Sequence, residues 1–334
     1  MDSDSLTTAR PGDRRRLGRT GVEVSALSLG TAPLGGMFAH VPPDQATALV
    51  RGALAAGLSY IDTAPQYGHG VAERRVGEAL AGVDRAAYVL STKVGRLVVE
   101  RREGGDTGIF ADAPPSDMVF DFSRDGVLRS FAASLERLGL DRVDVLYVHD
   151  PDDHEEQALT EALPALRDLR AQGVVGAIGV GMNQSRVPTR FVREADVDAV
   201  LIAGRLSLLD GSALDDLVPA CRERGVSLVV GGVYNSGVLA DPRRTPFYDY
   251  APAAPAVVER ALALEAVCAR HGVSLKAAAL QFPLRFREVA CVLTGARGPE
   301  ELDENLGLFA SVVPPALWEE LAAEGLLPGA AGAG

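Results

Sequence analysis

Cysteine is scarce in this sequence, and long apolar runs are absent. Cys221, Cys268 and Cys291 form an odd set without metal-ligand spacing, which indicates reduced thiols in a cytoplasmic protein. No run reaches about 18 apolar residues, the length that spans a bilayer. The N-terminus also lacks the charged and then apolar pattern of a secretory signal. The sequence therefore predicts a soluble cytoplasmic protein without a membrane segment.

Excess positive charge is missing as well. The formal net charge is −12, and the two arginine clusters, Arg14–Arg16 and Arg101–Arg102, are short. A protein that binds the phosphate backbone of a nucleic acid needs a continuous basic surface. We therefore expect a small-molecule substrate and no nucleic-acid partner. The sequence does not predict an oligomeric state.

Several nucleotide and metal motifs do not occur. The chain has no G-x-G-x-x-G fingerprint and no P-loop, so a dinucleotide would not bind in a Rossmann crevice. His149 and His154 flank an acidic stretch, which suggests a metal-dependent barrel hydrolase as a rival hypothesis. The five histidines show no H-x-H or H-E-x-x-H spacing, and a catalytic zinc needs about three protein ligands. We therefore expect no metal, and we interpret Asp150–Asp153 as a solvated turn.

Short apolar runs rich in β-branched residues alternate with helical patterns along most of the chain. The eight expected strands are Leu27–Thr31, Ser59–Asp62, Tyr88–Lys93, Val143–His149, Ala177–Gly181, Ala199–Ile202, Ser227–Gly231 and Val289–Leu293. The expected helices are Asp44–Ala56, Glu73–Leu80, Arg124–Leu138, Glu156–Ala171, Val187–Ala195, Leu214–Arg224 and Val257–Arg270. Eight strands with intervening helices favour an α/β fold of the closed (β/α)8 type, a TIM barrel.

One domain is expected over residues 14–326, between a disordered tail at 1–13 and a flexible tail at 327–334. Residues Arg16–Val24 predict a β-hairpin ahead of the barrel, placed to close its floor. Two long connections, Val94–Ser123 and Tyr234–Pro255, follow strands. We expect them as lids or binding loops on the C-terminal face of the barrel.

Four polar side chains stand at or just after strand ends, where packing does not require them: Asp62, Tyr67, Lys93 and His149. The carboxyl ends of parallel barrel strands meet at one functional face. There, an ammonium group beside Tyr67 favours its phenolate, Asp62 keeps Lys93 charged, and His149 can bind a substrate oxygen. Such a proton relay suits interconversion of a carbonyl and an alcohol, which also needs a nicotinamide or flavin for hydride transfer.

Each of these residues alone has a plain structural interpretation. Asp62 and Lys93 could be an ordinary buried ion pair, and Tyr67 could be a half-buried tyrosine with a satisfied hydroxyl. Their coincidence at neighbouring strand ends favours chemistry.

Six ordered motifs resemble those of the aldo-keto reductases over roughly residues 14–310. They are Gly30-Thr31, Tyr60–Gly68, Ser91–Gly95, Leu146–Asp150, Gly179–Asn183 and Pro299–Asn305. Within that family the chain is similar to the sugar-oxidising branch of L-fucose, L-galactose and D-threo-aldose 1-dehydrogenases, with pyridoxal 4-dehydrogenase as a relative. The resemblance implies oxidation of an aldose at C1 to a lactone.

The same resemblance implies a role for each matching residue. Tyr67 would exchange the proton, tuned by Lys93 and Asp62, while His149 orients the substrate. Asn183 corresponds to the residue that holds the nicotinamide carboxamide. The remaining residues implied to bind the cofactor are Thr31, then Ser236, Gly237 and Leu239 in the pyrophosphate loop, and Arg297, Glu301 and Asn305 at the adenosine end.

The chain departs from the family pattern at the cofactor. Ala203 and Gly231 stand where many relatives have a glutamine and an aromatic residue that hold the nicotinamide ring. Gly295, Ala296 and Glu301 replace residues that relatives use around the 2′-phosphate of NADP. A carboxylate repels that phosphate but can accept hydrogen bonds from a ribose diol. We therefore expect NAD, with NADP as the alternative that Arg297 would favour.

Two other functions fit the same sequence. The chain could act on pyridoxal or another aldehyde or ketone, or it could be a cofactor-sensing barrel subunit with little turnover. The complete set of four polar residues and the long loops favour an enzyme.

Overall fold

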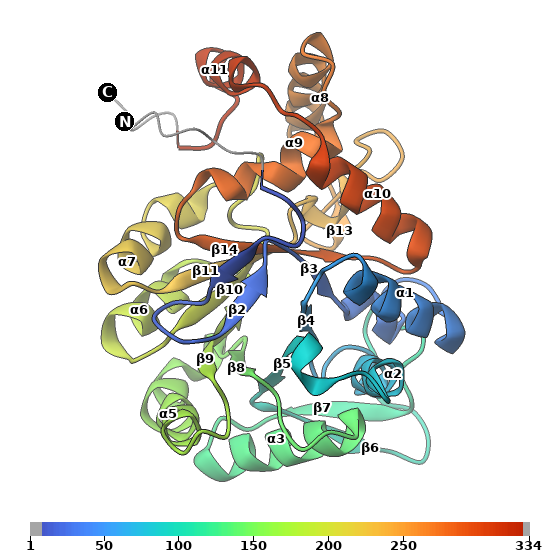
Figure 1. The fold of residues 1–334 in the computed structure, drawn as a ribbon, viewed down its shortest axis with the longest axis vertical. Coiled ribbons are helices and arrows are strands. Elements are labelled where there is room, and N and C mark those ends of the chain that lie inside the picture. The colour runs from blue at the N-terminus through green and yellow to red at the C-terminus, as the bar shows by residue number, and fades with distance from the viewer. Residues whose placement is uncertain (1–8, 330–334) are drawn as a thin grey trace.

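A computed structural model describes residues 9–329, and its eight parallel strands close into a barrel (Figure 1). The strands are β3 (Leu27–Gly30), β4 (Tyr60–Asp62), β5 (Val89–Val94), β8 (Val145–His149), β9 (Ala177–Met182), β10 (Ala199–Ala203), β11 (Ser227–Gly231) and β14 (Val289–Gly295). Each strand pairs with the next in this order, and β14 returns to pair with β3. The predicted (β/α)8 fold and all eight strands are confirmed.

Helices cover the outside of the barrel (Figure 1). They are α1 (Pro43–Ala55), α2 (Val71–Leu80), α3 (Arg124–Leu138), α4 (Glu155–Gln157), α5 (Leu163–Ala171), α6 (Arg186–Glu194), α7 (Leu217–Arg224), α8 (Pro255–Arg270), α9 (Leu275–Gln281), α10 (Pro299–Ala310) and α11 (Pro315–Ala323). The predicted helix at Glu156–Ala171 is α4 and α5 joined by a π-helical turn. The sequence analysis did not predict α9, α10 and α11.

Local sequence explains where the helices begin and end. In α3, the Ser123 hydroxyl accepts a hydrogen bond from the Gly126 N–H, which satisfies one of the free donors of the first turn. Gly139 ends the helix in a left-handed conformation, φ 63°, which glycine adopts without steric cost.

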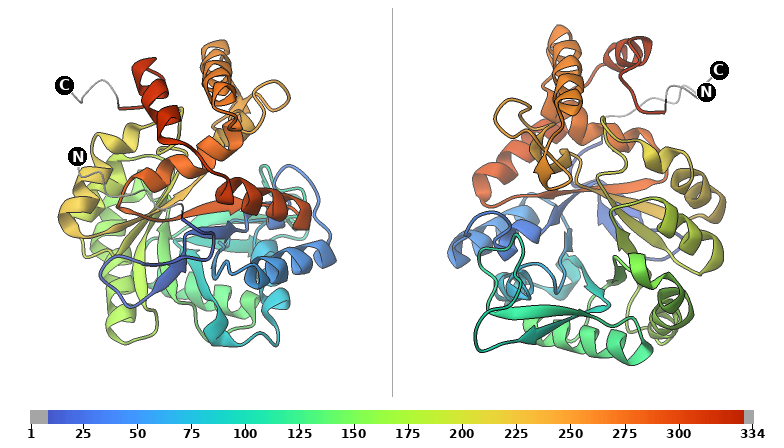
Figure 2. Two further views of the ribbon diagram at one scale, coloured as in Figure 1. Left: turned by 45° about the horizontal axis from the view of Figure 1, so that its top comes forward. Right: turned by 180° about the vertical axis from the view of Figure 1, so that it is seen from behind.

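The barrel has two separate apolar layers, one between strands and helices and one inside the barrel. The inner layer includes Tyr60, Tyr147 and Val229. The N-terminal hairpin of β1 (Arg14–Arg16) and β2 (Glu23–Ser25) adds Leu17 and Val24 to it, and Figure 2 shows this hairpin across one end of the barrel. The predicted hairpin therefore closes the floor.

The two long connections contain short strands of their own. β6 (Arg96–Glu100) and β7 (Ser116–Phe120) form an antiparallel hairpin within Val94–Ser123. In Tyr234–Pro255, β12 (Phe247–Tyr248) pairs with β13 (Ala251–Pro252). These short strands were not predicted from the sequence, because in the first segment glycines and prolines lie between the two strands and hide the pattern. The expected role of the two segments as lids or binding loops stays a prediction.

Most of the two predicted tails lies outside the described residues. Where the described part begins, the carbonyls of Pro11 and Asp13 accept hydrogen bonds from Leu27 and Ala26. The tail boundaries at 13 and 327 stay predictions. Between residues 9 and 329, no helix has the length and apolarity to cross a bilayer.

Candidate active site

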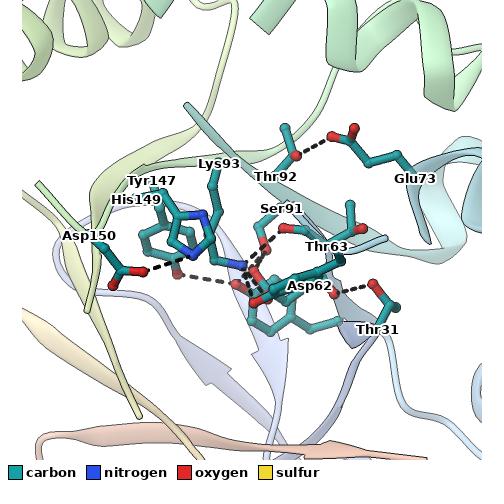
Figure 3. A network of polar contacts seen from close by, with 12 residues as sticks. Thr31, Asp62, Thr63, Glu73, Ser91, Thr92, Lys93, Tyr147, His149 and Asp150 are labelled. Carbon is teal, nitrogen blue, oxygen red and sulfur yellow. Dashed lines mark hydrogen bonds and ion pairs between the residues drawn. The ribbon is translucent and has the colours of Figure 1, made fainter. Parts of the chain in front are cut away.

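The four predicted catalytic side chains meet at the carboxyl ends of neighbouring strands. Figure 3 shows three of them, Asp62, Lys93 and His149. Asp62 ends β4, Lys93 is the next-to-last residue of β5, and His149 ends β8. Tyr67 follows β4 in the connection to α2. The parallel register fixes this convergence, because β4 pairs with β5 and β5 pairs with β8.

Lys93 is the centre of the cluster. Its ammonium nitrogen donates hydrogen bonds to Asp62 Oδ2 at 2.6 Å, to the Thr63 carbonyl at 3.0 Å and to Tyr67 Oη at 3.0 Å. The three acceptors use all three donors of an ammonium group. The arrangement therefore fixes Lys93 next to the phenol oxygen.

Burial and charge act against each other on the two titratable groups. Burial lowers the pKa of Lys93, but Asp62 and Tyr67 outweigh it, so the pKa is raised and the ammonium form persists. Burial raises the pKa of Tyr67 to about 12, although Lys93 acts in the opposite direction. The ammonium reduces the cost of forming a buried phenolate without bringing the pKa below its ordinary value.

A chain of three hydroxyl groups leads to the other carboxylate oxygen of Asp62. Ser91 Oγ donates to Asp62 Oδ1 at 2.7 Å, and Tyr60 Oη donates to Ser91 Oγ at 2.9 Å. Tyr147 Oη lies 3.1 Å from Tyr60 Oη. Burial raises the pKa of both Tyr60 and Tyr147, so they remain neutral. Asp62 is therefore oriented by two donors from β5, the Ser91 hydroxyl and the Lys93 ammonium group.

Thr31 lies at the edge of this cluster (Figure 3). Its hydroxyl donates to the Asp62 carbonyl at 2.9 Å, and the side chain is buried. The contact joins the end of β3 to the end of β4.

His149 is buried and neutral. Burial lowers the pKa of His149 well below its usual range, and the positive charges of Arg96 and Lys93 act in the same direction. Its ring meets the Tyr67 ring edge-on with the centroids 6.1 Å apart. Nδ1 is buried and has no hydrogen-bond partner among residues 9–329. A neutral imidazole can offer a substrate one donor and one acceptor.

Asp150 does not belong to the solvated turn that the sequence suggested for Asp150–Asp153. Asp152 and Asp153 are exposed, as expected for a solvated turn, but Asp150 turns toward the barrel mouth and pairs with Arg96 at 2.6 Å. The sequence analysis missed Arg96, because an arginine after Gly95 gives no signal of where its side chain points. Asp150 also has a left-handed backbone, φ 41°, a conformation that is uncommon in residues with a side chain.

Three loops place aromatic rings around Tyr67. Phe110 lies 6.4 Å from the Tyr67 ring, and Phe38 lies 6.5 Å from Tyr250, measured between centroids. Phe38 and Tyr250 are more than half exposed. The mouth of the barrel therefore has an aromatic rim.

The predicted pyrophosphate loop lies after β11. Ser236 and Gly237 both have positive φ, and Ser236 Oγ accepts a hydrogen bond from the Tyr250 N–H at 3.0 Å. Leu239 is fully buried beneath the loop. Asn183 stands at the end of β9, where its carbonyl accepts a hydrogen bond from Arg205. The four residues follow β9 and β11, which lie across the barrel from β4.

The predicted adenosine-end residues form a separate group where α10 begins: Arg297 lies just before the helix, and Glu301 and Asn305 lie within it. Glu301 Oε1 accepts hydrogen bonds from Arg297 Nε at 2.9 Å and from Arg297 Nη2 at 2.8 Å. Asn305 is buried, and its side-chain oxygen accepts a hydrogen bond from Tyr234 Oη at 3.0 Å. Tyr234 thereby connects α10 to the loop after β11.

Metal ligation has no support in the described part of the chain. No group of three or more His, Cys, Asp or Glu side chains in residues 9–329 is arranged to hold a metal ion. His154 instead packs its ring against Phe122, with the centroids 5.2 Å apart.

Known protein families and sequences agree with this geometry. The model of the aldo/keto reductase family matches residues 26–323. The chain is 42% identical to a D-threo-aldose 1-dehydrogenase of Pseudomonas over 316 residues, covering 92% of this chain and 96% of that protein. It is 41% identical to pyridoxal 4-dehydrogenase of Microbacterium luteolum over 339 residues, covering 94% and 98%. L-galactose dehydrogenase of Arabidopsis thaliana is 32% identical, covering 87% and 86%.

Solved structures agree with the fold. The holo form of an aldo-keto reductase from Bacillus halodurans matches with a TM-score of 0.74 at 25% identity, covering 94% of this chain and 96% of that one. A glycerol dehydrogenase from Gluconobacter oxydans matches with a TM-score of 0.75 at 24% identity, covering 95% and 97%.

Proposed function

The chain belongs to the aldo/keto reductase family, and from this membership we propose that it oxidises an aldose at C1 to a lactone with NAD. The family makes it an oxidoreductase that uses a nicotinamide cofactor. The observation that carries the proposal is the hydrogen bond from Lys93 to Tyr67 Oη, which prepares one oxygen for proton transfer. The relatives suggest a sugar of the fucose or galactose type.

The residues present fit a nicotinamide nucleotide at two places. Ala203 and Gly231 leave space at the ends of β10 and β11, since a Cβ on Gly231 would meet no atom closer than Leu201 at 4.0 Å. The first turn of α10 starts at Gly298, which has no side chain to cap the free N–H groups, and such a terminus favours phosphate. Asn183 would hold the carboxamide of the nicotinamide, and Ser236 would hold the pyrophosphate.

When bound, the nicotinamide nucleotide supplies the hydride acceptor that no side chain provides. Tyr67 Oη accepts the proton of the C1 hydroxyl. Lys93 stabilises the phenolate by the 3.0 Å hydrogen bond, and Asp62 keeps Lys93 charged and in place. His149, held neutral by burial, orients the hydroxyl toward Tyr67. These residues together remove one proton from the substrate oxygen as C1 becomes a carbonyl carbon.

The pairing of Arg297 with Glu301 at the start of α10 supports a preference for NAD. Glu301 holds the guanidinium of Arg297 through two hydrogen bonds, so this arginine is less free to bind a 2′-phosphate. A carboxylate near that position also repels the phosphate and suits a ribose diol.

Pyridoxal is a second candidate substrate. The aromatic rim of Phe38, Phe110 and Tyr250 can stack on a planar ring, and a close relative is named pyridoxal 4-dehydrogenase. An aldose offers hydroxyl groups instead, which the polar side of the mouth at Asp150 suits better.

A reducing compartment such as the cytoplasm fits the cysteines. Cys221, Cys268 and Cys291 are all buried free thiols. A small-molecule substrate, with no nucleic-acid partner, fits the net charge of −12.

Initial rates of nicotinamide reduction with NAD and with NADP test the proposal. The panel contains L-fucose, D-arabinose, L-galactose, L-xylose and pyridoxal, and the control is the Tyr67→Phe variant. Turnover of a sugar with NAD supports the proposal, and turnover of pyridoxal alone favours the second candidate. Tight dinucleotide binding without turnover of any substrate contradicts both and indicates a cofactor-sensing subunit.

A further inference from the structure

Arg96 and Asp150 form a charged pair at the barrel mouth that the proton relay does not use. Arg96 Nη2 donates to Asp150 Oδ2 at 2.6 Å, and 9% and 23% of the two side chains are exposed. The guanidinium carbon lies over the Phe120 ring, 4.9 Å from its centroid, a cation–π contact. Arg96 begins β6, and Asp150 follows β8. A pair this sheltered from solvent is screened only weakly by water.

The pair stands next to the reacting groups. Asp150 Oδ2 lies 3.6 Å from His149 Nε2, too far for a hydrogen bond but close enough for both to touch one substrate (Figure 3). A pocket of about 270 Å³ is lined by Arg96, Phe120, Asp150 and Asp152 together with Asn183. Asn183 is the residue implied to hold the nicotinamide, so this pocket adjoins the place where C1 reacts.

We propose that Arg96 and Asp150 recognise the C2 hydroxyl of the aldose, the group next to the reacting carbon. This inference rests on the proposed function. A sugar hydroxyl both donates and accepts a hydrogen bond, and the carboxylate and guanidinium offer one acceptor and one donor side by side. Asp150 has a left-handed backbone where the chain leaves β8, and its side chain lines the pocket together with Asn183.

The plain alternative is that the pair only anchors the β6–β7 hairpin to the end of β8. An anchor would support the shape of the mouth for every substrate alike. A hydroxyl-binding pair instead affects only substrates that carry the hydroxyl. Substrates that differ at C2 therefore separate the two roles.

The experiment compares D-arabinose with 2-deoxy-D-ribose, which is D-arabinose without the C2 hydroxyl, in the wild type and in Asp150→Asn. Asparagine tolerates the left-handed backbone and keeps the size of the side chain. Arg101→Met is the matched control, because it breaks the exposed pair with Asp117 on the same hairpin. The measured quantity is the ratio of kcat/KM for the two sugars in each protein.

In the wild type we expect a ratio of about 10 to 100 in favour of D-arabinose, the range of a hydrogen bond to a charged group. In Asp150→Asn the ratio should fall about three- to tenfold, because the amide oxygen still accepts a hydrogen bond but no longer carries the charge, while Arg101→Met keeps the wild-type ratio. An unchanged ratio in Asp150→Asn, with both sugars weakened alike, overturns the inference and leaves the proposed function standing. A wild type without turnover of any aldose overturns the proposed function itself.

If Asp150→Asn does not fold, Arg96→Lys gives the same test. Lysine keeps the charge that Asp150 needs but loses the planar pair of donors. Its ratio should also fall toward 1, and a wild-type ratio would overturn the inference.

Discussion

Lys93 donates a hydrogen bond of 2.6 Å to Asp62 while only 1% and 3% of the two side chains are exposed to solvent. Two opposite charges taken out of water are tolerated only when they remain paired and hydrogen-bonded. Ser91 donates a further hydrogen bond to Asp62, and the Tyr67 hydroxyl accepts one from Lys93. The centre of the site is therefore also a point on which the stability of the barrel depends.

Replacing Asp62 by asparagine should destabilise the protein by about 3–5 kcal/mol, because Lys93 then lies buried without a countercharge. Urea unfolding measures the change. Asp117→Asn, which removes an exposed pair with Arg101, should cost about 0–1 kcal/mol. Equal losses of unfolding free energy in the two variants would show that the charge of Lys93 does not depend on Asp62 for its stability in the core.

Replacing Tyr67 by phenylalanine should lower kcat by about 10²–10⁴-fold, the usual contribution of a positioned acid or base. The hydroxyl is lost while the ring remains, so the dissociation constant for the dinucleotide should not change. Tyr88→Phe, at the other end of β5, is the control. Activity retained by Tyr67→Phe would assign the proton transfer to another group.

The rate of sugar oxidation should rise with pH. Burial raises the pKa of Tyr67 to about 12, and the reacting form is the phenolate. Below that pKa the phenolate fraction grows about tenfold for each pH unit, so log kcat/KM should rise with a slope of about one. His149 stays neutral over this range because burial lowers its pKa. A flat profile between neutral and alkaline pH would argue against Tyr67 as the proton acceptor.

Gly35 controls the position of Tyr67 through a backbone contact. A Cβ at residue 35 would overlap the backbone of Tyr67 and Gly68. We expect Gly35→Ala to cost about 1–3 kcal/mol and to lower kcat, since Tyr67 must move. Gly307→Ala is the control: this exposed position in α10 has space for a methyl group, so stability should rise by about 0.5–1 kcal/mol. Thermal unfolding and kcat together separate the two effects.

The choice between NAD and NADP should depend on Glu301. Glu301→Gln removes the negative charge and weakens its hold on Arg297, which then becomes available to a 2′-phosphate. We expect kcat/KM with NADP, relative to NAD, to increase about tenfold, the effect of about 1.4 kcal/mol. An unchanged ratio would show that neither residue lies near the ribose.

Much of the fold follows from sequence periodicity. The eight strands were predicted because each is a short apolar run, and several of them end at a polar residue or glycine, as β4 does at Asp62. The helices α9 to α11 were missed, since Pro283 and the prolines at 314 and 315 break the apolar period around them. The β6–β7 hairpin was hidden because its two strands are separated by a glycine-rich segment.

Part of the site was predictable for the same reason. The register of parallel strands brings Asp62, Lys93 and His149 together once each is placed at a strand end. Arg96 and Asp150 were not predictable, because their pairing depends on the direction in which a hairpin and a left-handed residue turn their side chains. The pairing of Glu301 with Arg297 is local, because the two residues are four apart where α10 begins, and it could have been expected.

Transfer of deuterium from C1-deuterated D-arabinose to NAD tests the central claim most directly. We expect the reduced nicotinamide to carry the deuterium and the sugar product to be the lactone, and we expect Tyr67→Phe to form both about 10²–10⁴-fold more slowly. Turnover of the sugar without deuterium in the nicotinamide, or oxidation at another carbon, would contradict it.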